Sequence, residues 1–400
     1  MNVVDFSALP DVRVLAGAQI VDCSPLPVFS SDACAFLDAI SRSLMRNPKA
    51  KRYSDVVSFA YWCRRGNVLR EKQSREGRIE SRLGRGFALH IAPSNVPVNF
   101  AFSYVFSLLA GNATVVRCPS KAFDQVQVIL DAMREQFVEY PEVGRRSAFV
   151  TYPSSGKTTE ALCALSDVRV IWGGDATVAS IRALASKPRC VDIAFADRYS
   201  IALFNADAIN SLDEGGLSQL ARDFFNDTYL MDQNACSSPQ TILWVGADES
   251  VASARGAFWN SVASYAKQHY ELQAAVAVDK YVQLCGDVIR GIASGAEQHE
   301  GYLTTVELPD DIGLSTSLRG VGGYFYEKHV DGLLDVANDI DEKYQTIAQF
   351  GFDAKEVRQQ LIDARITGID RIVDVGKAMD IGLIWDGYDL IEAMSRTVYA

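Results

Sequence analysis

Apolar and polar positions alternate along this chain in a way that predicts strands and helices in regular succession from about residue 87 onward. Val98–Ala110 is almost wholly apolar and predicts a helix that is buried on most sides. Ala113–Val116 and Val168–Trp172 are short apolar runs typical of buried strands. Strands that alternate with helices in this way indicate a parallel, doubly wound sheet, so the predicted class is α/β.

The same pattern extends in both directions and predicts a second α/β region, with a domain boundary near residue 205. Residues 30–80 are predicted to be helical, and the charged cluster Arg64–Arg85 is expected on a solvated face. Further strands are predicted at Ala148–Tyr152, Cys190–Phe195, Ser200–Phe204 and Thr241–Val245, and further helices at Thr177–Ala185, Leu217–Leu230, Ser253–Ala266 and Asp279–Ile292.

Composition narrows the class of protein. A chain of 400 residues with 48% apolar content can bury a large core and is expected to form two or more domains. Its net charge of −11, with no basic tract, argues against binding to nucleic acid or to an anionic membrane. No apolar run has the length of a membrane span, and the first residues do not resemble a signal peptide.

Cysteine and histidine usage indicates the compartment and argues against a metal site. The eight cysteines are scattered without CxxC spacing, so we expect reduced thiols and a cytoplasmic protein. The four histidines lie far apart in the sequence, and we predict no metal site.

Two turns at the predicted sheet edge are candidate anion sites. Arg117, Ser120 and Lys121 follow a strand at its carboxyl end, where open α/β sheets bind anionic ligands. They fit either a phosphate site or an ordinary solvated turn. Gly173 and Gly174 separate a buried strand from a helix, which suits either a pyrophosphate site or a tight connection.

A third turn ends in Gly156-Lys157-Thr158 and invites comparison with a nucleotide-triphosphate loop. That loop needs an earlier glycine, and Thr151 occupies the position, so a true P-loop is not predicted.

Two residues are candidates for chemistry. Asn95 lies between Ser94 and Pro97, where its amide is either an oxyanion-hole donor or a helix cap. Cys236 lies in a polar loop with small neighbours, whereas the other cysteines mostly adjoin apolar residues. Loop position favours Cys236 as a nucleophile, although no histidine is near it in sequence.

Five ordered segments resemble the acyl-CoA reductase (LuxC) family, a branch of the aldehyde dehydrogenase superfamily. The resemblance begins near residue 85 and reaches the C-terminus. It implies a doubly wound cofactor domain and an α/β catalytic domain. The segments are APSNVP (92–97), LLAGNATVVRCPSK (108–121), IWGGDATV (171–178), MDQNACSSPQ (231–240) and GIDRIVDVGKAMDIGLIWDGYDLI (368–391).

The resemblance implies roles for particular residues. Cys236 matches the catalytic nucleophile and Asn95 the oxyanion-hole amide. The residues implied in cofactor binding are Ala92, Pro93, Ser94, Arg117, Ser120, Lys121, Gly173, Gly174, Asp175 and Thr177.

Two departures from the superfamily pattern are informative. Lys121 occupies the position at which many members of the superfamily have a glutamate that binds the adenosine ribose. A cation there favours NADPH, with NAD as the other candidate. Ala194 stands where aldehyde dehydrogenases carry the water-activating glutamate, which favours reduction of an acyl thioester over oxidation to an acid.

These implications predict an NADPH-dependent reduction of an acyl thioester to an aldehyde through an acyl-enzyme. Residues 1–205 are expected to bind the cofactor and residues 206–370 to carry the nucleophile. Residues 371–400 have two placements, against the cofactor domain or in a dimer interface. The expected partners are an acyl-CoA or other acyl thioester, an acyl-activating enzyme and further copies of the chain. An oxidative aldehyde dehydrogenase and a non-catalytic scaffold subunit are the alternatives.

Overall fold

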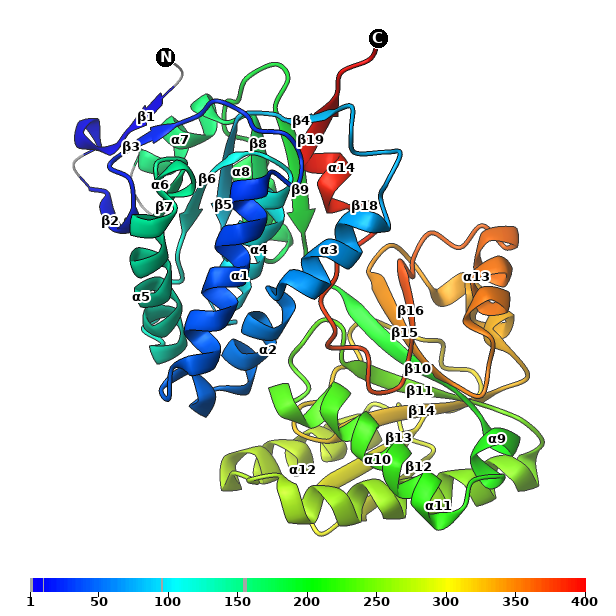
Figure 1. The fold of residues 1–400 in the computed structure, drawn as a ribbon. Coiled ribbons are helices and arrows are strands. Elements are labelled where there is room, and N and C mark those ends of the chain that lie inside the picture. Colours follow the sequence, from blue (N-terminus) through cyan, green and yellow to red (C-terminus); the bar gives the residue numbers. More distant parts are fainter. Residues whose placement is uncertain (1–2, 10, 95, 154–156) are drawn as a thin grey trace. The chain divides into compact units, whose positions relative to one another are not determined.

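The computed structural model describes residues 3–9, 11–94, 96–153 and 157–400. The chain divides into two compact units, shown in Figure 1. Unit 1 comprises Met1–Ala196 together with Leu383–Ala400, and unit 2 comprises Asp197–Gly382. Among the described helices, none combines the length and the apolar character that crossing a membrane requires.

The sheet of unit 1 has six strands in the order β2-β7-β6-β5-β8-β9. Neighbouring strands are parallel except for β2, which runs antiparallel to β7 at one edge. The strands are β2 (Arg13–Gly17), β5 (Phe87–Ile91), β6 (Ala113–Arg117), β7 (Ser147–Thr151), β8 (Val168–Trp172) and β9 (Val191–Phe195).

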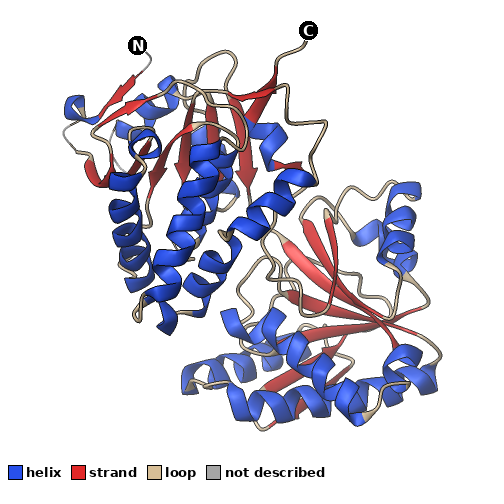
Figure 2. Ribbon diagram, in the orientation of Figure 1, coloured by secondary structure: helices blue, strands red, loops and turns tan. Residues whose placement is uncertain are grey.

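Helices and three small two-stranded sheets complete unit 1, and Figure 2 shows its strand layer flanked by helices. The helices are α1 (Ser31–Arg46), α2 (Ser54–Trp62), α3 (Arg65–Gln73), α4 (Asn99–Leu109), α5 (Asp124–Glu139), α6 (Pro141–Gly144), α7 (Thr158–Leu165), α8 (Asp175–Arg182) and α14 (Leu390–Met394). The small sheets pair β1 (Val3–Asp5) with β3 (Ile20–Asp22), β4 (Arg82–Gly84) with β19 (Ser395–Thr397), and β17 (Ile384–Trp385) with β18 (Tyr388–Asp389).

Helix α4 shows how local sequence produces this layer. Its ten residues from Phe100 to Leu109 are all buried, as its apolar sequence predicts. Gly111 ends the helix with a φ of +84°, and a side-chain carbon there would lie 2.1 Å from the carbonyl oxygen of Leu26. Only glycine fits both constraints, so the chain turns directly from α4 into β6.

Unit 2 contains a seven-stranded sheet in the order β12-β13-β14-β11-β10-β15-β16. Its strands are parallel except for the edge strand β12, which is antiparallel to β13. The strands are β10 (Tyr199–Asn205), β11 (Pro239–Val245), β12 (Gly295–His299), β13 (Leu303–Glu307), β14 (Tyr324–Val330), β15 (Tyr344–Phe350) and β16 (Arg371–Asp374). The helices are α9 (Ala206–Asn210), α10 (Glu214–Thr228), α11 (Asp248–His269), α12 (Ala274–Ile289) and α13 (Ala354–Asp363), with short 3-10 turns such as η3 (Tyr229–Met231).

The units divide at Ala196 rather than near residue 205. Strand β10 pairs with β11 on one side and with β15 on the other, so its hydrogen bonds place it in the sheet of unit 2. A boundary read from the alternation of strands and helices cannot show which sheet a strand joins.

A buried carboxylate lies in the aromatic core of unit 2. Glu327 is fully buried, and the indole N–H groups of Trp244 and Trp259 donate to its Oε2 at 2.7 and 2.8 Å. The Arg255 guanidinium lies 3.2 Å from the same oxygen. Burial still raises the pKa of this carboxyl above its usual value, because desolvation outweighs these partners.

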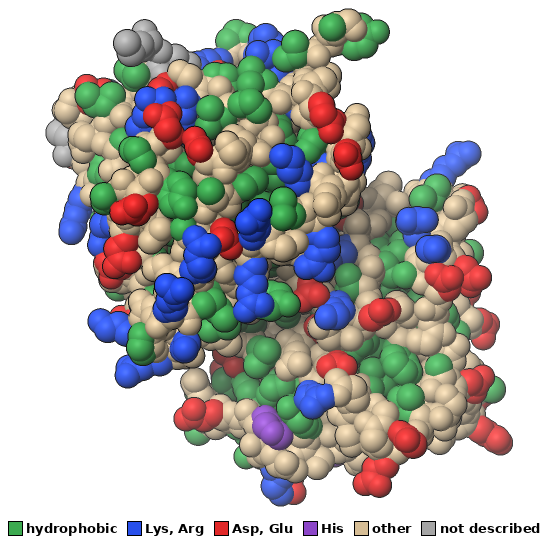
Figure 3. All heavy atoms as spheres, viewed as in Figure 1, with side chains coloured by type: hydrophobic (Ala, Val, Ile, Leu, Met, Phe, Trp, Pro, Cys, Tyr) green, Lys and Arg blue, Asp and Glu red, His purple; other side chains and the backbone are tan. Residues whose placement is uncertain are grey.

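The expectation that Arg64–Arg85 forms only a solvated face is wrong for three arginines. Arg75 is 4% exposed and pairs with Glu71 and Asp389. Arg82 donates to the backbone of residue 392 at 2.6 Å, and Arg85 to that of residue 393 at 3.0 Å. These contacts attach the C-terminal segment to unit 1. Elsewhere the expectation fits, since Figure 3 shows Lys and Arg side chains gathered over α1 to α3.

Candidate active site

Cys236 lies in the loop that connects η3 to β11, at the amino end of that strand. Two consecutive residues of this loop, Asp232 and Gln233, have φ values of +51° and +63°. Such values are uncommon for residues other than glycine and persist only where the surroundings hold them. The loop that carries the cysteine is therefore fixed by interactions outside its own backbone.

Gln233 provides most of that support through its buried amide. Its Nε2 donates to the carbonyl oxygens of Tyr324 at 2.9 Å and Pro239 at 3.3 Å. Its Oε1 accepts from the backbone N–H groups of Gly323 at 3.2 Å and Tyr324 at 3.1 Å. The side chain thus bonds to the start of β14 much as another strand would.

Gln240 completes this network from the other end of the loop. Its Nε2 donates to the carbonyl oxygen of Gln233 at 2.8 Å, and its Oε1 accepts from the N–H of Gly320 at 2.8 Å. Ser200 Oγ donates to the carbonyl oxygen of Cys236 itself at 2.7 Å. The backbone is therefore held on both sides of the thiol.

A buried carboxylate supports the loop from behind. Asp227, in the last turn of α10, accepts hydrogen bonds from the N–H groups of Gly376 at 2.6 Å and Ala378 at 2.9 Å. Its carbonyl oxygen accepts from Ser238 Oγ at 2.7 Å. Burial raises the pKa of Asp227 to about 7, because desolvation outweighs the two backbone donors.

Burial distinguishes Cys236 from most of the other cysteines. Cys23, Cys63, Cys118 and Cys163 are buried, whereas Cys236 is partly exposed. Desolvation raises the pKa of the Cys23 thiol to about 11 and that of Cys118 to about 12, so both stay protonated at neutral pH. Cys34 and Cys190 are partly exposed as well, and Cys285 is exposed.

The strand order of unit 1 has a point where the connections between strands reverse direction. From β5 the chain proceeds outward through β6 to β7, and then returns to place β8 on the other side of β5. The crevice beyond the carboxyl ends of two such strands is where open α/β sheets bind ligands. The predicted residues Ala92, Pro93 and Ser94 follow β5, and Gly173 and Gly174 follow β8.

The two glycines after β8 have different surroundings. A side-chain carbon at Gly173 would lie 3.0 Å from Cβ and Cγ2 of Thr177, so this glycine permits close packing of the turn. A carbon at Gly174 would meet no described atom within 4 Å. Gly174 is the N-cap of α8, which begins at Asp175, so the open space lies at the N-terminus of a helix.

The predicted basic residues lie on the same edge, Arg117 as the last residue of β6 and Lys121 in the turn after it. The Arg117 guanidinium lies 4.9 Å from the ring centroid of Tyr152, and Lys121 Nζ lies 5.2 Å from that of Phe123. Ser120 and Lys121 are exposed. An aromatic ring therefore orients each cation, and Lys121 still faces solvent.

A buried histidine connects three elements of unit 1. His90 Nδ1 lies 2.6 Å from Ser103 Oγ, which also accepts from Trp172 Nε1 at 3.0 Å. Burial lowers the pKa of His90 to about 3, so the ring is neutral. These contacts tie β5, α4 and β8 together.

Two predictions fall on parts of the chain that the structure does not describe. Asn95, the expected oxyanion-hole amide, lies outside the described residues, as does the turn at 154–156.

The family model named Acyl-CoA reductase (LuxC) matches residues 39–397. The chain belongs to the acyl-CoA reductase (LuxC) family. No curated protein sequence matches it.

Solved structures confirm the predicted aldehyde dehydrogenase fold for this LuxC-family chain. Aldehyde dehydrogenase 21 from Physcomitrella patens, in complex with succinate, is 12% identical with a TM-score of 0.60, over 92% of this chain and 85% of that one. A 1-pyrroline-5-carboxylate dehydrogenase from Thermus with bound NAD is 13% identical with a TM-score of 0.61, over 91% and 80%. An oxidoreductase from Marinobacter aquaeolei is 12% identical with a TM-score of 0.62, over 94% and 86%. At 12–13% identity, the similarity to these structures shows the fold alone.

Sequence analysis of this LuxC-family chain missed the residues that hold the cysteine loop. Gln233 and Gln240 lie inside the segment MDQNACSSPQ, and their only signal was that they are polar neighbours of the cysteine. Asp227 carried no signal, because its partners Gly376 and Ala378 are about 150 residues away in sequence. Contacts of that separation arise only on folding.

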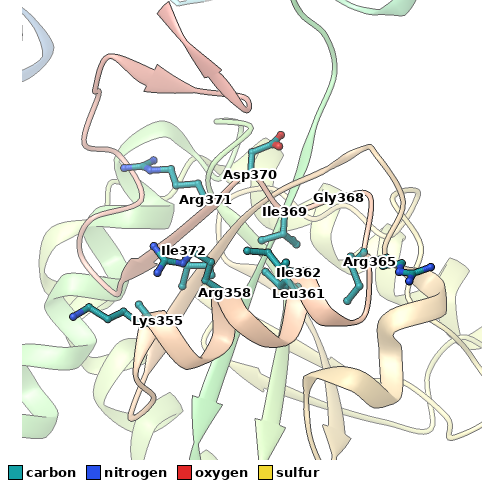
Figure 4. Close-up of a pocket in the computed structure, with 12 residues that line it drawn as sticks. Lys355, Arg358, Leu361, Ile362, Arg365, Gly368, Ile369, Asp370, Arg371 and Ile372 are labelled. Atoms are coloured by element: carbon teal, nitrogen blue, oxygen red, sulfur yellow. The ribbon is translucent and has the colours of Figure 1, made fainter. Parts of the chain in front are cut away.

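Unit 2 also has a groove of about 450 Å³ between α13 and β16 (Figure 4). Leu361, Ile362 and Ile369 form apolar parts of its lining, and Lys355 and Arg358 extend along one end. None of the twelve residues that line this groove was predicted as a site residue from the sequence.

Proposed function

We propose that this chain reduces an acyl thioester to an aldehyde through an acyl-enzyme on Cys236. The Cys236 thiolate attacks the carbonyl carbon of the thioester and forms a new carbon–sulfur bond. The carbonyl electrons move onto oxygen and then return, breaking the bond to the donor's sulfur. The donor leaves as a thiol after it takes up a proton, and the acyl group stays on Cys236.

The observation that carries this proposal is a partly exposed cysteine, Cys236, on a loop whose backbone is held from outside. Gln233, Gln240 and Asp227 restrain this loop through buried hydrogen bonds. A fixed loop keeps the nucleophile near its reactive geometry and so reduces the entropic cost of attack.

Two donors are proposed for the oxyanion, the Cys236 backbone N–H and the side-chain amide of Asn95. Donors of this kind contribute roughly 3–4 kcal/mol each to transition-state stabilisation in comparable sites. The assignment of Asn95 comes from its place in the segment APSNVP.

Unit 1 fits a nicotinamide dinucleotide. Its strand order has a reversal between β5 and β8, and Gly174 faces open space at the N-terminus of α8. Ala92, directly after β5, and Asp175 and Thr177, in the first turn of α8, border the same edge. Such a cofactor would supply a hydride to the acyl-enzyme carbonyl, after which the aldehyde is released and the Cys236 thiolate is restored.

We infer a preference for NADPH from the turn after β6. In dinucleotide-binding sheets, a carboxylate after the second strand binds the ribose 2′-hydroxyl. Here β6 ends in Arg117 and the following turn carries Lys121, and the first carboxylate after β6 is Asp124 at the start of α5. A cationic turn suits a 2′-phosphate.

Ala194 supports the reductive direction. It lies in β9 opposite Ile171 of β8, and its side chain has no group that activates water. Without such a base, the acyl-enzyme thioester would persist long enough to accept hydride.

In this proposal unit 1, which includes the returning C-terminal segment, holds the cofactor, and unit 2 carries the nucleophile. The acyl donor is an acyl-CoA or an acyl group delivered by an activating enzyme.

Intact-protein mass spectrometry after incubation with a panel of acyl-CoAs, without reductant, tests the proposal. The wild-type chain should gain the mass of one acyl group. Cys236→Ala should gain none, and Cys285→Ala, the matched control with an exposed cysteine removed, should behave as wild type. Acylation of Cys236→Ala, or none of the wild type, would overturn the assignment.

A further inference from the structure

Unit 1 has a positively charged surface that the composition of the whole chain does not suggest. The chain has a net charge of −11, yet residues 31–73, which span α1 to α3, contain nine Lys and Arg and only four Asp and Glu. All nine cations are exposed, and Figure 3 shows Lys and Arg side chains gathered over these helices. We call the nine Lys and Arg residues from Arg42 to Lys72 the basic surface.

Most cations of the basic surface have no carboxylate beside them. Arg42 pairs with Asp38, and the other eight form no ion pair within the described part of the chain. A second carboxylate of the same segment, Glu71, pairs with the buried Arg75 at 2.7 Å. Exposed cations that remain unpaired attract anions over about 8 Å at physiological ionic strength, since only water and salt screen them. The basic surface is therefore built to meet an acidic partner.

Two exposed apolar side chains lie in the same segment. Tyr61 on α2 is 57% exposed and Leu69 on α3 is 40% exposed, and no other large apolar side chain of residues 31–73 is exposed. The Arg64 guanidinium lies 4.1 Å from the ring centroid of Tyr61. A tyrosine beside arginines is typical of protein–protein interfaces, in which these two residue types contribute much of the binding energy.

This composition favours an acidic protein over a membrane or a nucleic acid. Helices that bind a membrane surface insert a broad apolar face, and single apolar side chains on two helices do not form one. Residues 31–73 carry a charge of +5, so the rest of the chain carries −16 and repels a long polyanion that extends past the basic surface. A protein with a local acidic face meets the cations alone.

The extent of the basic surface also suits a protein. Helix α1 has 16 residues and is about 24 Å long, and the cations continue through α2 and α3. A protein interface covers about 800 Å² on each partner and can use a surface that spans three helices. The phosphates of a single nucleotide engage only a few of these cations at once.

We propose that the basic surface docks an acidic acyl carrier protein, which presents its acyl group as a thioester on a phosphopantetheine arm. The inference rests on the proposed function for the group that is carried. Coenzyme A bears its acyl group on the same arm, so a chain that accepts acyl-CoA meets the same reacting groups on a carrier protein. The two donors differ in what holds the arm, a nucleotide or an acidic protein.

The basic surface would act on binding of the donor and not on the chemistry. In the transfer, the Cys236 sulfur forms a bond to the carbonyl carbon and the bond to the sulfur of the arm breaks. The carrier leaves with a free thiol once that sulfur takes up a proton. Complementary charge raises the rate at which donor and acceptor meet, because it steers the encounter.

Fluorescence anisotropy with a labelled acyl carrier protein tests docking on the full chain. Arg65→Glu, at the first residue of α3 where a glutamate suits the helix N-terminus, should weaken binding at least about fivefold, as should Arg52→Glu before α2. Arg358→Glu on α13, an exposed arginine outside the basic surface, is the charge-matched control and should bind as the wild type does. Wild-type binding should also weaken as salt rises from about 50 to about 500 mM, a readout that needs no variant.

Intact-protein mass spectrometry of Cys236 acylation separates docking from the chemistry. With the acyl-loaded carrier at low concentration, Arg65→Glu should react at least about fivefold more slowly than the wild type. With the matching acyl-CoA, the two should react alike. A wild type that binds the carrier but is acylated by neither donor would refute the proposed function and leave the docking site standing.

Four results would overturn the docking proposal. The first two are no binding of the carrier to the wild type, and equal loss of binding in Arg65→Glu and Arg358→Glu. The third is equal slowing of Arg65→Glu with both donors, which would assign the basic surface to the nucleotide of coenzyme A. The last is tighter binding of phosphatidylglycerol vesicles or of a short DNA duplex than of the carrier, which would assign it to a membrane or a nucleic acid.

Discussion

The buried carboxylate of Asp227 accepts a 2.6 Å hydrogen bond from the backbone N–H of Gly376. A second bond, from the N–H of Ala378, holds the other carboxylate oxygen at 2.9 Å. Because the carbonyl of Asp227 also accepts from Ser238 Oγ, one residue joins α10, the cysteine loop and the segment after β16. The position of Cys236 thus depends on contacts with residues far along the chain.

Asp227→Asn should change how stability depends on pH. Burial raises the pKa of Asp227 to about 7, above the ordinary 3.8, so the folded chain holds a proton that the unfolded chain releases between these values. The stability associated with this proton is fully present below pH 3.8 and is lost as the pH rises through about 7. Asn lacks this titration. The difference in free energy of unfolding, wild type minus variant, should therefore fall by up to about 1.4 kcal/mol per pH unit over this window.

Urea unfolding at several pH values measures that difference. A flat difference for Asp227→Asn would contradict the prediction.

Gln233→Ala should destabilise the chain and slow acylation of Cys236. The change leaves the N–H groups of Gly323 and Tyr324 and two carbonyl oxygens without these partners. Unpaired buried groups cost about 1–3 kcal/mol each, so a total loss of about 2–4 kcal/mol is expected with partial relaxation.

Denaturant unfolding and the rate of acyl-adduct formation check both effects. Asn234→Ala, an exposed neighbour whose amide makes one bond at 3.2 Å, is the control and should change either quantity little. Equal behaviour of the two variants would show that the Gln233 network is dispensable.

Gly376→Ala should destabilise the segment after β16. Gly376 has a φ of +92°, and a side-chain carbon there would lie 2.8 Å from Cβ of Asp223. Backbone strain of this kind costs about 1–3 kcal/mol, and the close contact adds to it. Thermal unfolding against Gly332→Ala, where an added carbon meets nothing within 4 Å, checks the prediction. Similar melting of both variants would argue against it.

Gly174→Ala should weaken cofactor binding while leaving the stability of the fold nearly unchanged. The backbone at Gly174, with φ −66° and ψ 166°, accepts alanine, and the added carbon has space. Stability should therefore be nearly unchanged. A bound pyrophosphate would occupy that space, so we expect at least about tenfold weaker NADPH binding. Fluorescence titration of wild type, Gly174→Ala and Gly256→Ala, another position with open space, measures this. Full affinity in Gly174→Ala would place the pyrophosphate elsewhere.

Lys121→Glu should change cofactor preference from NADPH toward NADH. The substitution puts a carboxylate on the exposed turn after β6, where it repels a 2′-phosphate and accepts from a ribose hydroxyl. Titration with both cofactors gives the ratio of affinities, with Lys187→Glu on another part of unit 1 as a charge-matched control. An unchanged ratio would remove Lys121 from the cofactor site.

Much of the local structure follows from the sequence. The apolar run Val168–Trp172 is strand β8 at the predicted bounds, and the buried helix after Pro97 is α4. These elements are predictable because burial on all sides leaves few polar positions in a run of five to eleven residues. The family could also be inferred from the sequence, because the residues of each short motif follow one another along the chain.

The sequence did not show which of the two sheets a strand would join. The run at Ser200–Phe204 predicts a strand, but pairing with β11 and β15 assigns β10 to unit 2. From the sequence, Arg75 and Arg82 are expected on a solvated face. In the structure, both contact the C-terminal segment, Arg75 through Asp389 and Arg82 through Ser395.

By itself, then, the sequence determined the α/β class, the order of elements and the family, because local periodicity and short motifs depend on neighbours along the chain. Tertiary structure alone decided that Gln233 bonds to Tyr324, that Asp227 holds Gly376, and that α12 turns Lys280 inward. Each of these joins groups between 42 and 149 residues apart in sequence, and a buried polar group finds its partner only when the chain has folded around it.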